Sequence, residues 1–97
     1  MSASELANNR IEQIRTALNA ALDADFLEII DESHLHAGHA GARTGLGHFH
    51  IKIVAPEFSG LSLIKRHRLV YGAVGALMET DIHALGIEAI APNERVD

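Results

Sequence analysis

The sequence predicts a small α+β domain, a two-layer sandwich in which helices cover one face of a three-stranded sheet. Apolar residues recur at spacings of three and four between Phe58 and Met78, which is typical of an amphipathic helix. Three shorter stretches, at 26–31, 48–54 and 82–90, are rich in β-forming residues. At 97 residues the chain suffices for a single domain spanning 1–97, whose ordered core we expect at about 10–92.

The first helix is predicted from apolar residues at helical spacing, with Asn8 or Asn9 as its N-cap and an end near 23–25. These residues are Ile11, Ile14, Leu18, Ala21 and Leu22. Residues 1–9 are interpreted as a loose lead without a basic n-region or an apolar h-region, so we expect no signal peptide. No apolar run approaches the roughly 20 residues that span a bilayer, and we expect a cytoplasmic protein without a membrane partner.

Two strands follow, joined by a long loop. Phe26–Asp31 is expected to place Leu27 and Ile29 on one face. Residues 33–47 hold four glycines without apolar periodicity, which predicts a flexible His/Gly-rich loop. In the stretch 48–54, Phe49, Ile51 and Ile53 alternate with His48, His50 and Lys52, so we expect one buried face and one face that meets water.

The strongest periodic signal is the helix between Phe58 and Met78. Its predicted core stripe is Leu63, Ile64, His67, Val70, Tyr71, Val74, Leu77 and Met78, preceded by Ser62 as N-cap. We expect this stripe to pack on the apolar face of the 48–54 strand. A third strand is predicted at 82–90, giving the order helix, strand, strand, helix, strand with short extra helical turns.

The composition limits which ligands the chain can bind and which reactive groups it can supply. The formal net charge of −5 argues against broad attraction to nucleic acid, although Lys65, Arg66 and Arg68 form a local basic cluster. There is no cysteine, so the chain forms no disulfide and supplies no thiolate. Five of the seven histidines lie between His34 and His50, and histidine is the commonest metal ligand among side chains.

Several motifs resemble those of the BolA family and follow one another along the chain as they do in that family, over roughly residues 10–92. They are Phe58-Ser59-Gly60-Leu61, Arg66-His67-Arg68-Leu69-Val70-Tyr71, Asp31-Glu32-Ser33, His48-Phe49 and Ile82-His83-Ala84-Leu85. The resemblance implies a fold similar to the class II KH domain. It also implies a monothiol glutaredoxin with a Cys-Gly-Phe-Ser site as partner, and a bridging 2Fe–2S cluster to which glutaredoxin and glutathione contribute thiolates.

In that family the BolA-like chain supplies a histidine at the start of the last strand and a second ligand from the loop. The first position matches His83, and the second matches His36 best, with His34 and His39 as competitors. Because this loop has no cysteine, both ligands would be imidazoles, which raises the potential of a cluster relative to an all-cysteine site. We expect the chain alone to be a monomer or a weak homodimer.

Other interpretations remain open. His67 at the centre of the apolar stripe is expected to be a hydrogen-bonded core residue, and His48 and His50 to meet water. Lys65, Arg66 and Arg68 are expected to form a solvated helix face, with phosphate binding or partner docking as the alternative. The resemblance also implies a second function, a nucleic-acid-binding transcriptional regulator that uses this basic face. The Gly-x-x-Gly of KH domains does not occur at the matching position, and aromatic residues for base stacking are few. No nucleophile with a base partner and no phosphate loop is evident, so we expect no enzyme activity.

Overall fold

The computed structural model describes residues 3–33 and 47–94 of the chain. Their elements follow the order α1 (Ala3–Ala21), β1 (Phe26–Asp31), β2 (Gly47–Val54), α2 (Leu63–Val74), α3 (Leu77–Thr80) and β3 (Ile82–Ile90). Short 3₁₀ turns lie at Pro56–Phe58 and Pro92–Glu94. Except for Ser33 and Gly47, the predicted 33–47 loop lies outside the described residues.

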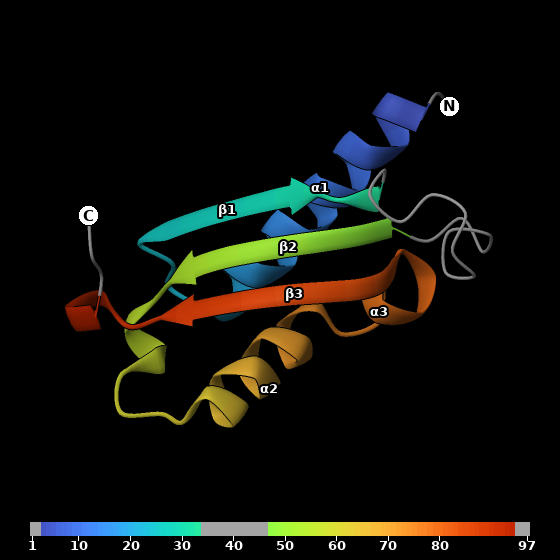
Figure 1. Cartoon of the computed structure of the whole chain (residues 1–97). Helices are drawn as coiled ribbons and strands as arrows, with labels where there is room; N and C mark the ends of the chain where they lie inside the picture. The colour runs from blue at the N-terminus through green and yellow to red at the C-terminus, as the bar shows by residue number, and fades with distance from the viewer. Residues whose placement is uncertain (1–2, 34–46, 95–97) are drawn as a thin grey trace.

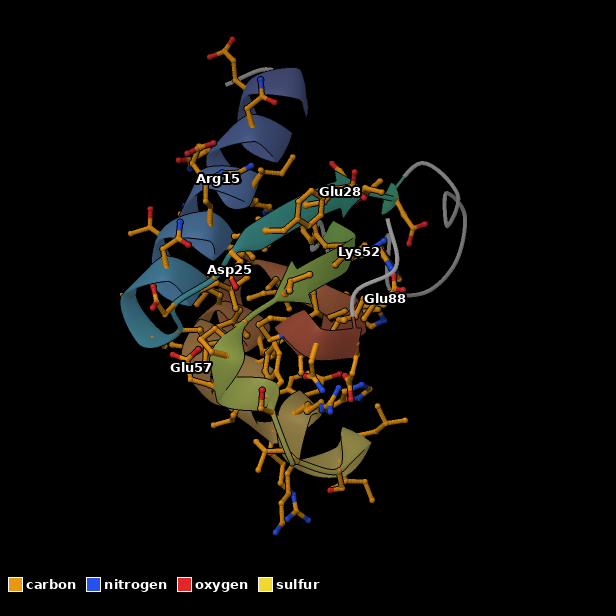
Figure 2. The ribbon with its side chains drawn as sticks, turned by 90° about the vertical axis from the view of Figure 1, so that its left-hand side faces the viewer. Arg15, Asp25, Glu28, Lys52, Glu57 and Glu88 are labelled. Carbon is orange, nitrogen blue, oxygen red and sulfur yellow. The ribbon has the colours of Figure 1, made fainter. Side chains whose placement is uncertain are left out.

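The three strands form one sheet in the order β1-β2-β3, with β1 antiparallel and β3 parallel to β2. The helices lie on one face of this sheet (Figure 1), which confirms the predicted two-layer α+β sandwich. None of the described helices covers the other face. Across it, Lys52 on the central strand lies in register with Glu28 and Glu88 on the two outer strands (Figure 2).

The core lies between the sheet and the helices. Phe49, Ile51 and Ile53 alternate on β2 at 0–2% exposure, as predicted, because the helices cover this face. The same cluster contains Ile14 and Leu18 of α1, Leu22 just after that helix, Val70 and Val74 of α2, Ile82 and Ala89 of β3, and Phe58. In the described part of the chain, no helix is long and apolar enough to cross a bilayer.

The predicted loose lead at residues 1–9 is wrong, because α1 begins at Ala3. Residues 3–7 have no apolar periodicity, but alanine, glutamate and leucine among them have high helix propensity and extend the helix backward. The predicted end near residue 23 is close to the observed end at Ala21.

The predicted long helix is divided in two. Ser62 caps α2 as expected, its side chain accepting a hydrogen bond from the Lys65 N–H. The helix ends after Val74 because Gly75 adopts a φ of 50°, a conformation that favours glycine and cannot continue an α-helix. The chain then forms the separate short helix α3 before entering β3.

The predicted core stripe of α2 is correct only in part. Val70 and Val74 are buried, but Leu63, Ile64 and Tyr71 are exposed at 67%, 65% and 41%. The third buried residue of α2 is Arg66, at 6% exposure. The inward row is therefore Arg66, Val70 and Val74 at spacings of four, rotated from the row that hydropathy alone selects.

Candidate functional site

His83 lies at an irregularity near the start of β3. Gly47 is paired with Ile82, but the next residue of β2, His48, is paired with Ala84, so β3 contains one extra residue. That residue is His83, and this arrangement is a β-bulge. The His83 side chain is exposed, so its imidazole is available to a ligand or a partner.

The nearest described imidazole is that of His48. The two ring centroids are 5.0 Å apart and the ring planes are inclined by 55°. His48 was predicted to meet water, which is wrong, because its side chain is only 7% exposed. Alternation along the strand correctly assigns His48 to the face opposite Phe49. The bulge, however, places the His83 ring against it, which a pattern within one strand does not indicate.

Hydrogen bonds hold the two ends of the histidine-rich segment beside this pair. The Asp31 carboxylate accepts from the Ser33 N–H at 2.8 Å, and the Ser33 hydroxyl accepts from the His48 N–H at 3.0 Å. The Glu32 N–H donates to the His48 carbonyl at 2.8 Å. These contacts explain the Asp31-Glu32-Ser33 motif physically, because they join the end of β1 to the start of β2.

The exit of the segment is equally fixed. The Gly47 N–H donates to the Asp81 carbonyl at 2.9 Å, immediately before β3. A Cβ atom at Gly47 would overlap the ring of Phe49, so glycine is required for this close approach. Asp81 in turn accepts from the Arg10 side chain of α1 at 3.4 Å.

The groups at this site that could coordinate a metal are the imidazole rings of His83 and His48. Within residues 3–33 and 47–94, no group of three or more His, Asp or Glu side chains comes together in an arrangement that could hold a metal ion. His83 and His48 are therefore at most part of a donor set. His34, His36 and His39 lie outside the described residues, so their assignment as ligands stays a prediction.

The basic cluster divides into two environments. Lys65 and Arg68 are exposed, whereas Arg66 points inward. The Arg66 guanidinium donates to the carbonyls of Leu61 and Ala89 and, through two nitrogens, to the Glu94 carboxylate at 2.6 and 2.9 Å. The prediction of a solvated face is thus wrong for Arg66, because its partner Glu94 lies 28 residues away along the chain.

This ion pair changes the acid–base properties of both groups. Hydrogen bonds from Arg66 and from the Ala91 backbone lower the pKa of Glu94 to about 2, because they stabilise the carboxylate. The hydrogen bond with Glu94 raises the pKa of Arg66. Arg66 therefore remains charged and engaged at every physiological pH.

The remaining histidines lie in other environments. His67 is half-buried rather than enclosed in the core, and it lines a groove with Leu63, Ile87 and Glu88. His50 is half-buried on the uncovered face, where its ring lies over Gly86 of β3. Neither ring takes part in the contact between the imidazoles of His48 and His83.

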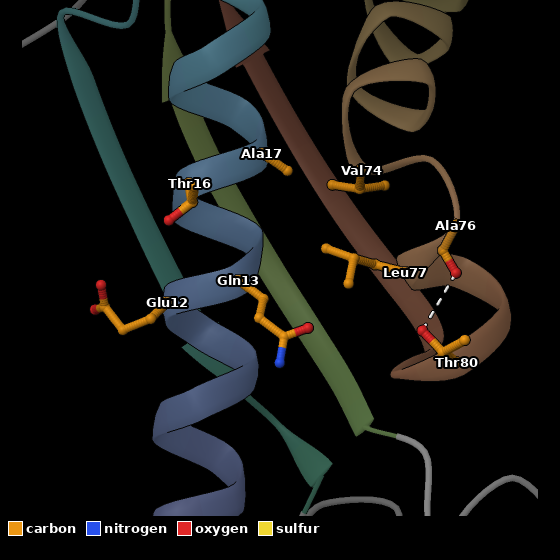
Figure 3. A pocket seen from close by; sticks show the side chains of 8 residues that line it. All are labelled: Glu12, Gln13, Thr16, Ala17, Val74, Ala76, Leu77 and Thr80. Carbon is orange, nitrogen blue, oxygen red and sulfur yellow. Dashed lines mark hydrogen bonds between the residues drawn. The ribbon is translucent and has the colours of Figure 1, made fainter.

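A separate hollow of about 500 Å³ lies between α1 and the α2–α3 corner (Figure 3). Ala17, Val74 and Leu77 line it together with Glu12 and Gln13 of α1, of which Gln13 points toward the α2–α3 corner and Glu12 points away from it. Among the described residues that line it, the only titratable one is Glu12, which also pairs with Arg15. The hollow thus offers apolar contact and no set of groups for acid–base or metal chemistry.

With this geometry established, comparison with known proteins identifies the family. A family model described as BolA-like protein matches residues 18–94. The chain belongs to the BolA-like family. The BolA-like match includes β1, β2, α2 and β3, and therefore His48, His83 and the Arg66–Glu94 pair.

Curated relatives and solved structures agree. The chain is 41% identical over 96 residues to the chloroplastic protein BOLA1 of Arabidopsis thaliana and 42% identical over 79 residues to human BolA-like protein 1. These matches cover 96% and 81% of this chain but only 60% and 56% of the relatives. This BolA-like chain thus spans somewhat more than half of their length.

The solved BolA structures have the same fold. BolA1 from Arabidopsis thaliana superposes with a TM-score of 0.76 at 37% identity, covering 90% of this chain and 96% of that structure. The BolA domain of SufE1 from the same plant gives 0.76 at 41% identity, covering 87% and 93%. These likenesses confirm the family and the fold, and they leave the ligands to be tested.

Proposed function

We propose that this BolA-like protein is a partner of a monothiol glutaredoxin and co-ligates a bridging 2Fe–2S cluster through histidines. The proposed ligands are His83 and one histidine of the adjoining segment, with His36 favoured over His34 and His39. Glutaredoxin and glutathione supply the thiolates, which this cysteine-free chain lacks. The role is iron–sulfur cluster trafficking or iron regulation rather than catalysis, and the cluster is cargo.

The observation that carries the proposal is the environment of His83. It is exposed at a bulge, in contact with a second imidazole, and both fixed ends of the histidine-bearing segment lie beside it. Imidazole nitrogen is an accepted replacement for thiolate on one iron of a 2Fe–2S centre. An incomplete donor set suits a cluster shared at an interface, because each protein then supplies only part of the coordination.

His48 has a supporting role in this proposal. Its ring lies against that of His83, and its backbone is held at both the N–H and the carbonyl. Neighbouring groups of this kind restrict the orientation of a ligating histidine and thereby tune the site. The sequence pattern alone gave no reason to favour His48.

The test is to reconstitute the complex with a monothiol glutaredoxin and glutathione, using the full chain and its His83→Ala variant. We expect the variant to lose the mixed 2Fe–2S absorption spectrum while its circular dichroism stays native. In the unsubstituted complex, pulsed EPR of the reduced cluster should show coupling to imidazole nitrogen. His36→Ala should weaken or spectrally alter the complex, with His34 or His39 partly substituting.

His67→Ala is the matched control, because His67 is a half-buried histidine that lines a groove with Ile87 to Ile90, at the end of β3 opposite His83. It should keep both spectrum and couplings. If the His83→Ala complex retains its cluster together with the nitrogen couplings, His83 is not a ligand and the proposal fails.

DNA binding through Lys65, Arg66 and Arg68 is the alternative function, and the geometry of Arg66 disfavours it. The two exposed cations are too few for the six to ten phosphate contacts typical of strong electrostatic binding. Replacing Lys65 and Arg68 by alanine should therefore leave any DNA affinity unchanged at physiological salt. A steep loss would favour the alternative.

A further inference from the structure

The first turns of α2 expose a mixed apolar and basic surface, which we call the α2 outer face. It consists of Leu63, Ile64, Lys65, Arg68 and Leu69. Leu63, Ile64 and Leu69 are exposed at 67%, 65% and 39%, and they are three of the five large apolar side chains exposed in the described part of the chain. Leu63 and Ile64 are neighbours in the first turn, and exposed apolar side chains that lie together mark interaction surfaces more often than single exposed residues do.

Within residues 3–33 and 47–94, no ion pair neutralises the charges on this face. Arg10, Arg15 and Arg66 each pair with an acidic side chain of the chain, at Asp81, Glu12 and Glu94. Among the described residues, no acidic group lies within ion-pair distance of Lys65 or Arg68. In a protein with a net charge of −5, these two cations form a local exception that favours an acidic partner.

The spacing of these residues suits a helical partner. Ile64 and Arg68 are four residues apart, as are Lys65 and Leu69, so apolar and basic side chains alternate diagonally over about one and a half turns. A groove of about 850 Å³ adjoins the first turn, and its lining is partly apolar, with Leu61, Leu63 and Ile87, and partly charged, with Lys52, Arg66, Glu88 and Glu94. An apolar side chain of the partner can contact the apolar part beside Leu63. Helices that dock on such faces insert apolar anchors at spacings of three and four.

This surface is distinct from the site at His83. The first turn of α2 lies near the end of β3 that leads into the last 3₁₀ turn, whereas His83 lies at the opposite end of that strand (Figure 1). A partner on α2 therefore does not need to contact the histidines.

From the exposed apolar residues and the unpaired cations together, we propose that the α2 outer face binds an acidic amphipathic helix of a partner protein. Carboxylates of that helix pair with Lys65 and Arg68, while its leucine-like side chains cover Leu63 and Ile64 and enter the adjoining groove. Nucleic acid fits this face less well. Phosphates gain nothing from Leu63 and Ile64, and two cations neutralise few of them.

The test uses a phage-displayed library of helix-forming peptides of about four turns with random exposed positions, selected against the full chain. We expect enrichment of Asp and Glu three or four positions from Leu, Ile or Met. Titration of a selected peptide into the isotope-labelled chain should shift the amide resonances of residues 63–69. A DNA duplex is titrated in parallel.

Variants of the chain then show which residues of the α2 outer face contribute to peptide binding. Lys65→Glu with Arg68→Glu, and separately Leu63→Ser with Ile64→Ser, should each weaken the peptide by roughly tenfold or more. All four positions are exposed, so the fold should persist, as circular dichroism will show. Ile30→Ser is the matched control, because Ile30 is an exposed apolar residue of β1 on the uncovered sheet face, and it should leave binding unchanged.

The decisive experiment exchanges the charges of the peptide and of the protein. Replacing the acidic residues of the selected peptide by lysine should abolish binding to the native chain and restore it to the charge-reversed variant. The proposal is overturned if no peptide is enriched, if the enriched peptides are not acidic, or if the shifts map away from residues 63–69. Shifts there with DNA but with no peptide would instead identify a nucleic-acid surface.

Discussion

His50 and Gly86 are paired across β2 and β3 on the uncovered face of the sheet. A Cβ atom at Gly86 would lie only 2.8 Å from Nδ1 of His50, so the absence of a side chain at residue 86 is what makes room for the imidazole. At the scale of single residues, the molecule contains several such pairs, in which the position of one side chain depends on the identity of another residue. Gly47 with Phe49 and Arg66 with Glu94 are others.

Gly86→Ala should destabilise the protein by about 1 kcal/mol, because the new methyl group displaces the His50 ring. In a His50→Ala background the same substitution should be neutral or slightly stabilising, since alanine is favoured over glycine in a strand. Urea denaturation of the four proteins in this cycle measures the coupling. Additive effects would show that the ring does not depend on Gly86.

Val74→Asp should unfold the protein, because Val74 is 3% exposed within the core and an unpaired carboxylate there costs several kcal/mol. Total stabilities of small domains are about 5–15 kcal/mol. Ile64→Asp, in the same predicted stripe but 65% exposed, should melt within a few degrees of the native chain. Thermal melts of both variants check the burial pattern, and equal losses would support the stripe that hydropathy predicts.

At the scale of elements, the last 3₁₀ turn is fastened to α2 through the Arg66–Glu94 pair. The Glu94 carboxylate also accepts from the Ala91 N–H at 3.0 Å, which closes the turn on itself. The Arg66 nitrogen that reaches Ala89 ties the same helix to β3. One buried guanidinium thus connects three elements, and it replaces the apolar residue that the helix would otherwise place at this position.

The contribution of the Arg66–Glu94 ion pair to the stability of the fold should depend on pH. The pKa of Glu94 falls from 4.5 to about 2 on folding, so its stabilisation is complete above about 4.5 and is lost as the pH falls toward 2. The difference in melting temperature between the native chain and Glu94→Gln should therefore be largest at pH 6 and shrink steadily as the pH falls from 4.5 toward 2. A difference that stays constant across this range would show that the carboxylate is not stabilised by folding.

At the scale of the whole molecule, sequence patterns predict most of the architecture. The bounds of β1 and β3 are those expected from Phe26–Asp31 and Ile82–Ile90, and β2 begins one residue early, because alternation and flanking breakers are local signals. The class of fold is confirmed by the relatives.

What the sequence could not predict depends on contacts between distant segments. Hydropathy places Arg66 outside because its partner Glu94 is remote, and it places His48 in water because the bulge at His83 is a property of strand pairing. Of the candidate site, the exposure of His83 could be anticipated from its position at a strand start. The roles of His34, His36 and His39 stay predictions.

The bonds from α2 to β3 have a consequence for solubility. β3 is an outer strand, and the outward backbone groups of such strands can pair with another chain and start aggregation. Here the Tyr71 hydroxyl donates to the Leu85 carbonyl and Arg66 donates to the Ala89 carbonyl, four residues further on. Side chains of one helix thus occupy two of the acceptors that an incoming strand would need, and the sheet stops at three strands.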